Sequence, residues 1–198
     1  MSVSLTNQMG DAIDDYAQVD VHPTAKLSWA STAVGRVSIG ARSAVFAGAH
    51  IRGDVAPIVI GEDVNIQEGC LLHTSAGSPL SVGDHTTVGH GAILHGCTIG
   101  KNVLVGMGSI VMDDAVVGDN CLIGAGSLIT GGKHFEAGSM IMGSPARAVR
   151  QLTETEIDAL ITQSADSYVE VSEKMADQGL LVRPERETRI WPAPSAGA

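Results

Sequence analysis

Aliphatic residues recur every six positions along most of this chain, and this period constrains the fold more than any other feature. A small or β-branched residue stands two positions before most of them, and glycine often follows directly. The pattern indicates short strands with one buried face, joined by tight corners. With three strands to a coil, it predicts an all-β triangular solenoid of about seven coils. We call each aliphatic position a rung; the twenty rungs are Val21, Leu27, Ala33, Ile39, Val45, Ile51, Ile60, Ile66, Leu72, Val82, Val88, Leu94, Ile99, Val105, Val111, Val117, Ile123, Ile129, Phe135 and Ile141.

The residues after the last rung predict a C-terminal α-helix. Thr153 and Glu156 have the spacing of a capping box, and apolar residues then follow with helical period. Gly179 is a typical C-terminal stop, so we expect the helix over about residues 154–178, along a side of the solenoid of its own or a neighbouring chain. The sequence thus divides into an N-terminal segment (1–20), a solenoid (21–146), an exit segment with the helix (147–178) and a Pro-rich, extended tail (179–198).

The composition limits the partners and the location. A formal net charge of −10 in 198 residues argues against nucleic acid and anionic membranes as partners. No stretch has the length of a transmembrane helix, and residues 1–20 lack the pattern of a secretory signal, so we expect a cytoplasmic protein. Cys70, Cys97 and Cys121 each stand two positions before a rung, and none stacks above another. We therefore expect buried thiols without disulfides.

Counting rungs places two histidines together. His73 follows the rung Leu72, His95 follows the rung Leu94, and these rungs are one coil apart. The two imidazoles should therefore stack on one face, about 4.8 Å apart along the axis. One coil below, Arg52 occupies the same column.

A third histidine, His90, belongs to a neighbouring face that also carries Gln67. In a threefold trimer, one face of each chain would meet the other face of its neighbour, which would place His90 beside His73 and His95 of the next subunit. Three neutral histidines with an open fourth position are the ligand set of a catalytic Zn²⁺ site, and Fe²⁺ or Co²⁺ would also suit imidazole. Such a metal lowers the pKa of its bound water to about 7.

Two segments carry a family resemblance: IRGDVAPIVIGEDVNIQEGCLLH and TVGHGAILHGCTIGKNVLVGMGSIV. The six-residue pattern resembles that of hexapeptide-repeat proteins, and these segments with their histidine spacing resemble the gamma-class carbonic anhydrase family. The resemblance implies a left-handed parallel β-helix, a homotrimer, and a metal held by His73 and His95 of one subunit with His90 of the next. It implies reversible hydration of CO2 to bicarbonate as the activity.

The same resemblance assigns further residues. Arg52 and Asp54 match a family pair that bridges subunits; an anion-binding role for Arg52 stays open beside the salt bridge. Asn65 and Gln67 match residues near the metal-bound water, and Gln67 could orient that water by hydrogen bonding. Tyr168 resembles a tyrosine that the C-terminal helix brings near the site.

Two departures from the family pattern bear on activity. Glu68 stands where the family has aspartate, and its longer side chain could disturb the groups around the metal ligands. The segment TSAGSPL after His73 is short and neutral, whereas the family enzyme carries an acidic loop with a proton-shuttle glutamate there. Rapid turnover needs a group that removes the hydration proton, and the sequence offers only histidines that we expect on the surface: His50, His85 and His134.

Two other functions stay open. Hexapeptide-repeat proteins include acyltransferases, and some relatives of the gamma class are thioesterases, so the chain could act on an acyl-CoA thioester. A scaffold with a vestigial site is the third alternative, although three intact histidines count against it.

Overall fold

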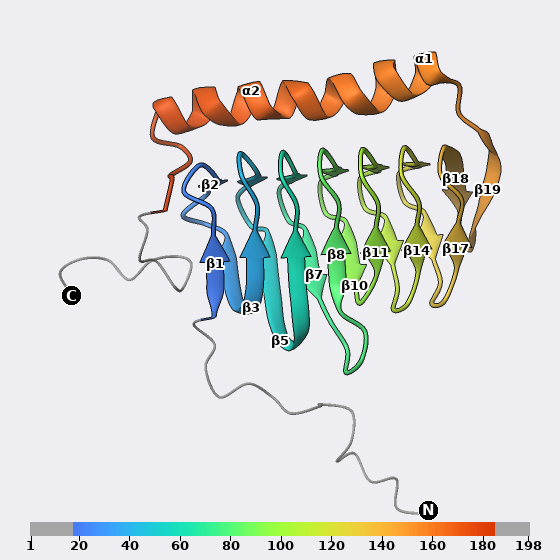
Figure 1. Ribbon diagram of the computed structural model, residues 1–198, viewed down its shortest axis with the longest axis horizontal. Helices are drawn as coiled ribbons and strands as arrows, with labels where there is room; N and C mark the ends of the chain where they lie inside the picture. The colour runs from blue at the N-terminus through green and yellow to red at the C-terminus, as the bar shows by residue number, and fades with distance from the viewer. Residues whose placement is uncertain (1–17, 185–198) are drawn as a thin grey trace, which may run out of the picture.

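The computed structural model describes residues 18–184 and is a solenoid with one helical rod along its side (Figure 1). Its coils stack in parallel, and the C-terminal helix runs back over them from the last coil to the first. This is the predicted left-handed β-helix of about seven coils with its C-terminal helix. Segment 1–17 and segment 185–198, which include most of the predicted N-terminal segment and tail, lie outside the described residues.

An eight-stranded sheet forms the face under the helix, which we call face 3. Its strands are β2 (Lys26–Leu27), β4 (Ala44–Val45), β6 (Asn65–Ile66), β9 (Thr87–Val88), β12 (Leu104–Val105), β15 (Leu122–Ile123), β18 (Ser139–Gly143) and β19 (Ala146–Gln151). The last strand of this sheet, β19, was not predicted from the sequence. It is formed by the expected exit segment, which folds back as an antiparallel partner of the preceding strand, β18.

An eleven-stranded sheet forms the other two faces, because two of its strands, β3 and β5, run unbroken round the corner between them. Face 1 holds the first parts of β3 (Thr32–Ile39) and β5 (His50–Ile60), followed by β7 (Leu71–His73), β10 (Ile93–His95), β13 (Ile110–Val111) and β16 (Leu128–Ile129). Face 2 holds the later parts of β3 and β5, with β1 (Val19–Val21), β8 (Leu80–Val82), β11 (Thr98–Ile99), β14 (Val116–Val117) and β17 (His134–Phe135).

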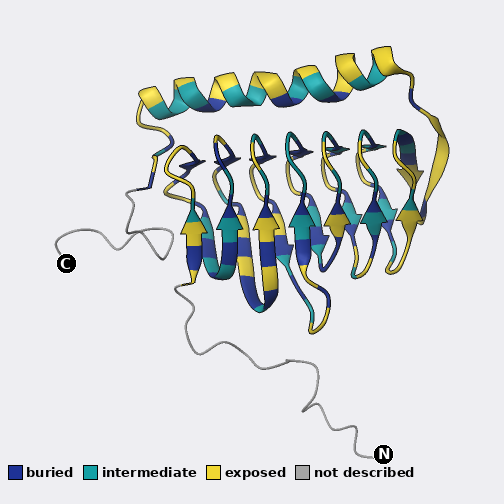
Figure 2. Cartoon of the chain, in the orientation of Figure 1, coloured by how far each residue is buried: buried dark blue, intermediate teal, exposed yellow. Residues whose placement is uncertain are grey.

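The rungs form the core of the solenoid. All rungs except Val21 and Phe135 are buried, and along β3 every second residue is buried (Figure 2). Cys70, Cys97 and Cys121 fill inward slots as free thiols, as predicted. Burial raises the pKa of Cys70 to about 11 and that of Cys97 to about 12, so these thiols are protonated and unreactive at neutral pH.

The corners need residues with left-handed backbone conformation. The corner from face 3 to face 1 carries a glycine of positive φ in each coil after the first, and one of these, Gly91 (φ +67°), directly follows His90. Elsewhere glycine is needed for close approach: a Cβ on Gly106 would lie 2.5 Å from the backbone nitrogen of Ala125. Glycines at the corners and beside the rungs therefore set how closely the coils pack.

The C-terminal helix begins with the predicted capping box. The Thr153 hydroxyl accepts from the backbone of Glu156, whose carboxylate accepts from the backbone of Thr153. The helix comprises α1 (Glu154–Glu156), a π-helical turn η1 (Ile157–Thr162) and α2 (Gln163–Asp177). None of these helices is long and apolar enough to cross a membrane within the described residues.

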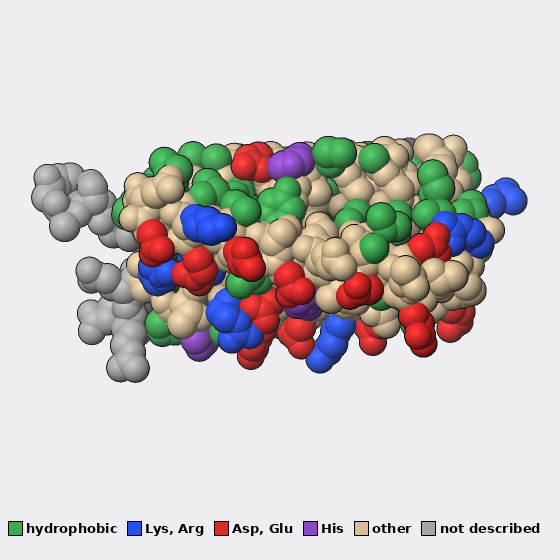
Figure 3. All heavy atoms as spheres, turned by 90° about the horizontal axis from the view of Figure 1, so that it is seen from above, with side chains coloured by type: hydrophobic (Ala, Val, Ile, Leu, Met, Phe, Trp, Pro, Cys, Tyr) green, Lys and Arg blue, Asp and Glu red, His purple; other side chains and the backbone are tan. Residues whose placement is uncertain are grey.

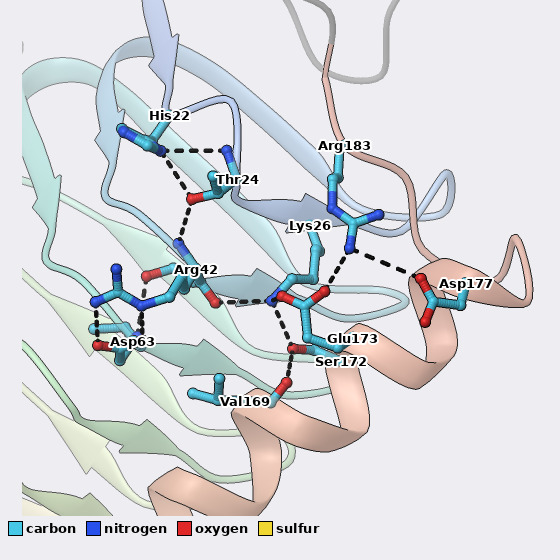
Figure 4. A network of polar contacts seen from close by, with 12 residues as sticks. His22, Thr24, Lys26, Arg42, Asp63, Val169, Ser172, Glu173, Asp177 and Arg183 are labelled. Carbon is cyan, nitrogen blue, oxygen red and sulfur yellow. Dashed lines mark hydrogen bonds and ion pairs between the residues drawn. The ribbon is translucent and has the colours of Figure 1, made fainter.

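The far end of the helix is fastened to the first coils by a buried lysine (Figure 4). The ammonium of Lys26 is fully buried and lies 2.6 Å from a carboxylate oxygen of Glu173. It also donates to the Ser172 hydroxyl and the Arg42 carbonyl. Residues 179–184, the described part of the predicted tail, are docked rather than extended into solvent, because Leu181 is buried and Val182 pairs with β2.

Acidic and apolar side chains separate on the helix-covered surface. Hydrophobic groups gather toward one long edge and acidic groups toward the other, with a few basic groups among them (Figure 3). The distribution agrees with the excess of negative charge in the sequence.

Lys26→Met should loosen the helix from the solenoid. The substitution keeps the aliphatic volume but removes three polar contacts, so we expect a loss of about 1–3 kcal/mol in the free energy of unfolding, measured with urea. Lys101→Met is the matched control, because Lys101 pairs with Asp84 on the surface and should matter little. Equal effects of the two substitutions would contradict a role for the buried lysine in fastening the helix.

Candidate metal centre

His73 and His95 lie side by side, as the rung count predicts. They are paired in the parallel register of β7 and β10. Their ring centroids are 5.0 Å apart, and Nδ1 of His73 lies 3.0 Å from Nε2 of His95. Two imidazole nitrogens from adjacent coils therefore face each other on face 1.

The other nitrogen of each ring meets a carboxylate. Nε2 of His73 is 3.1 Å from Asp54, and Nδ1 of His95 is 2.5 Å from Asp113. We assign the ring protons to these nitrogens, since a carboxylate accepts a hydrogen bond. The two facing nitrogens then both carry lone pairs, and a cation between them would resolve the repulsion.

Electrostatics favour neutral His73. Burial of the ring lowers its pKa, which outweighs the opposing effect of the hydrogen bond with Asp54. Burial of Asp54 opposes ionisation, but hydrogen bonds from Arg52 and His73 hold its pKa below the usual value. Arg52 is 2.5 Å from Asp54 within the same chain. A neutral imidazole beside an ionised carboxylate is the state in which histidine binds a metal.

His90 lies at the opposite edge of face 1, in the corner between faces 3 and 1. Glu68 occupies the equivalent position one coil below, since the nitrogen of Gly91 donates to its carbonyl. The Glu68 carboxylate is 2.7 Å from Nδ1 of His90. The longer acid thus reaches the ring and leaves Nε2 as the free nitrogen of this half-exposed histidine.

A buried amide chain supports His90 from below. Gln67 accepts from the backbone nitrogen of His90 at 3.1 Å and donates to Asn65 at 3.1 Å. Asn65 in turn donates to the Thr87 hydroxyl at 2.8 Å. These contacts fix which end of the Gln67 amide carries oxygen, so one N–H of Gln67 is left for a further acceptor.

A pocket of about 290 Å³ lies between face 3 and the helix, and it brings Gln67, His90 and Tyr168 together. The Tyr168 ring packs edge-on against Phe46, with centroids 6.0 Å apart. The pocket is hollow because three glycines follow successive rungs on this face, with apolar side chains beside them; these residues are Gly89, Gly106, Gly124, Leu104, Met107, Leu122 and Ala125.

The paired histidines fit a metal, but one chain supplies only part of a site. Two nitrogens bound to tetrahedral Zn²⁺ at about 2.05 Å would be about 3.3 Å apart, close to the observed 3.0 Å. Within residues 18–184 of one chain, no group of three or more histidine, cysteine, aspartate or glutamate side chains is arranged to hold a metal ion. The predicted third ligand from a second subunit stays a prediction.

The remaining histidines do not join this arrangement. His50 contacts the Thr32 hydroxyl, and His134 is exposed on β17. His85 is partly exposed and contacts the Thr162 carbonyl and Asp166 of the helix. Sequence reasoning missed Asp113; its place one coil above His95 could have been found by extending the rung count to the acidic residues.

Comparisons with known proteins agree with the fold. Residues 96–131 match the model of the bacterial transferase hexapeptide (six repeats), and residues 79–112 match the hexapeptide repeat of succinyl-transferase. A "Probable carbonic anhydrase" of Methanocaldococcus jannaschii is 49% identical over 142 residues, which are 72% of this chain and 89% of that protein. The carnitine operon protein CaiE of Escherichia coli is 40% identical over 137 residues, 69% of this chain and 70% of that protein.

A solved structure is similar along most of its length. The hexapeptide transferase family protein from Anaplasma phagocytophilum is 40% identical, with a TM-score of 0.74, and the match covers 79% of this chain and 92% of that one. The names of these relatives thus refer to two kinds of chemistry on one fold, that of a carbonic anhydrase and that of a transferase.

Asn65→Ala and Gln67→Ala should each destabilise the chain by about 1–3 kcal/mol, because each leaves a buried partner unsatisfied. The double variant should cost less than the sum by about 1 kcal/mol, since the two side chains share a hydrogen bond. Urea unfolding of the four proteins measures this coupling. Strict additivity would mean that the amide chain does not act as a unit.

Proposed function

We propose that this chain hydrates CO2 reversibly at a metal centre shared between subunits. The chain belongs to the hexapeptide-repeat family of left-handed β-helix proteins and is gamma-class carbonic anhydrase-like. The observation that carries this proposal is the pair of facing nitrogens of His73 and His95. Both rings already direct their other nitrogen at a carboxylate, so a cation is the natural partner for the pair.

A second copy of the chain would supply His90. Face 1 bears a ladder of partly exposed aliphatic side chains on successive coils, which lies between His90 and the histidine pair; its members are Leu71, Ile93, Ile110 and Leu128. Leu71 is 43% exposed, and Met112, which follows the rung Val111 on the same face, is 41% exposed. An uncovered apolar stripe of this kind supports burial against another subunit, in the predicted homotrimer.

The residues of the site have separate tasks in this proposal. His73 and His95, with His90 of the neighbouring subunit, would hold Zn²⁺, Fe²⁺ or Co²⁺, which supplies an activated water at neutral pH. The amide of Gln67 is fixed with one N–H left for a further acceptor, so it can orient a substrate oxygen in the pocket. Arg52 holds Asp54 ionised, and Asp54 keeps His73 in the orientation that binds the metal.

The pocket favours acyl-thioester chemistry as a second candidate function. Its walls are mostly apolar and its volume of about 290 Å³ far exceeds what CO2 requires. An acyl group would fit beside Gln67 and His90, and the same activated water could attack its carbonyl carbon. The transferase name of the Anaplasma relative agrees with a hexapeptide-repeat fold that handles acyl groups.

Stopped-flow measurement of CO2 hydration tests the proposal. Protein purified anaerobically and loaded with Zn²⁺, Fe²⁺ or Co²⁺ should hydrate CO2, and His73→Ala should reduce the rate to background. His134→Ala is the matched control, because this exposed histidine lies on face 2 away from the site. Binding of metal without hydration, together with hydrolysis of thioesters, would support the second candidate; failure to bind any metal would refute both.

Hydration should depend on added buffer. The loop over residues 74–79 has no titratable side chain, so the hydration proton has no acceptor there. At constant ionic strength and pH 7, we expect the rate to rise several-fold with imidazole concentration and then saturate. A rate independent of buffer would reveal an internal proton acceptor, and the half-exposed Glu68 beside His90 would be the first residue to replace.

A further inference from the structure

The loop after His73 is fastened to a coil two turns away by two serine–aspartate pairs. The Ser75 hydroxyl donates to Oδ2 of Asp113 at 2.9 Å, and the Ser78 hydroxyl donates to Oδ1 of Asp114 at 2.7 Å. The loop is closed on itself by a bridge between the two serines. It therefore spans the coil that carries His95.

Only one of these two aspartates also contacts a histidine. Oδ1 of Asp113 lies 2.5 Å from Nδ1 of His95, while its Oδ2 accepts from Ser75. Both carboxylate oxygens are thus committed, one to a candidate metal ligand and one to the loop. Asp114 binds the same loop without touching a histidine.

The backbone around His95 is shaped to admit this carboxylate. Gly96, with φ of +53°, directly follows the histidine, and a Cβ there would lie 2.4 Å from Oδ1 of Asp113. It would also lie 2.9 Å from Cβ of Ser78. Any side chain at this position would displace either the carboxylate or the loop.

We infer that Asp113 is a positioning residue for His95, and that Ser75 couples the 74–79 loop to it through the second carboxylate oxygen. The inference deepens the proposed function, on which its metal-binding part rests. Asp113 keeps the proton of His95 on Nδ1, so that Nε2 is the nitrogen turned toward His73. The loop holds the carboxylate in place, and a displaced loop would let the imidazole turn away.

Two kinds of measurement test the inference. In metal-free protein, the ¹⁵N shifts of the His95 ring report which nitrogen carries the proton. We expect Nδ1–H in the wild type and a mixture in Asp113→Ala. Titration with Co²⁺, monitored by calorimetry and by the visible spectrum of the bound ion, reports whether the ligands are oriented to bind the metal. Asp113→Ala should weaken Co²⁺ binding about 10- to 100-fold.

Matched variants separate positioning from structural support. Asp113→Asn keeps an acceptor for His95 and should recover most of the affinity. Ser75→Ala should weaken binding and change the Co²⁺ spectrum, whereas Ser78→Ala, which removes the neighbouring fastening of the same loop, should leave both unchanged. Equal effects of the two serine substitutions, or an unchanged His95 tautomer in Asp113→Ala, would overturn the inference.

The outcomes distinguish this inference from the proposed function. A wild-type chain that binds no Co²⁺ would refute the metal centre, while the ring tautomer would still decide whether Asp113 orients His95. Metal binding that disappears in His73→Ala but is indifferent to Asp113→Ala would leave the proposed function standing and refute the positioning role.

Discussion

In-register stacking of each coil on the next is the constraint on which the rest of this structure depends. Because like positions lie above one another, a residue acquires its neighbours from other coils rather than from nearby sequence. Each carboxylate around the histidines illustrates this: Asp54, Glu68 and Asp113 all come from a coil adjacent to that of their partner ring. The metal centre proposed here is therefore a property of the stacking and not of any single strand.

The repeat is least regular where these side chains gather. From rung Leu72 to Val82 the chain takes ten steps, and from Ile51 to Ile60 it takes nine, against six in the regular pattern. From Leu94 to Ile99 it takes five. All three departures fall at the corner between faces 1 and 2. Extra residues there place Asp54 and Ser75 outside the six-residue repeat, and Gly96, in the short step after His95, leaves space for the carboxylate of Asp113.

The sequence alone predicted whatever follows from the period. The β-helix, the inward cysteines, the C-terminal helix and the stacking of His73 on His95 all come from counting positions, and each is present. Contacts made across an insertion or by an added element could not be counted. Lys26 precedes a rung and so faces away from the core; the helix covers it and supplies Ser172 and Glu173 as partners. Asp113 meets Ser75 across 38 residues because a loop crosses a coil.

The arrangement of ligands links assembly to metal affinity. One chain offers two facing nitrogens on one edge of face 1 and a third histidine on the other edge, separated by an apolar ladder. A metal site with ligands from both edges can form only when two copies meet. Each bound ion would therefore stabilise the contact between subunits by mass action. The carboxylates reduce the cost of that step, because His73, His90 and His95 are each oriented before the partner arrives. Side chains already held in place lose little conformational freedom on binding, which leaves more of the metal–ligand energy for the assembly itself.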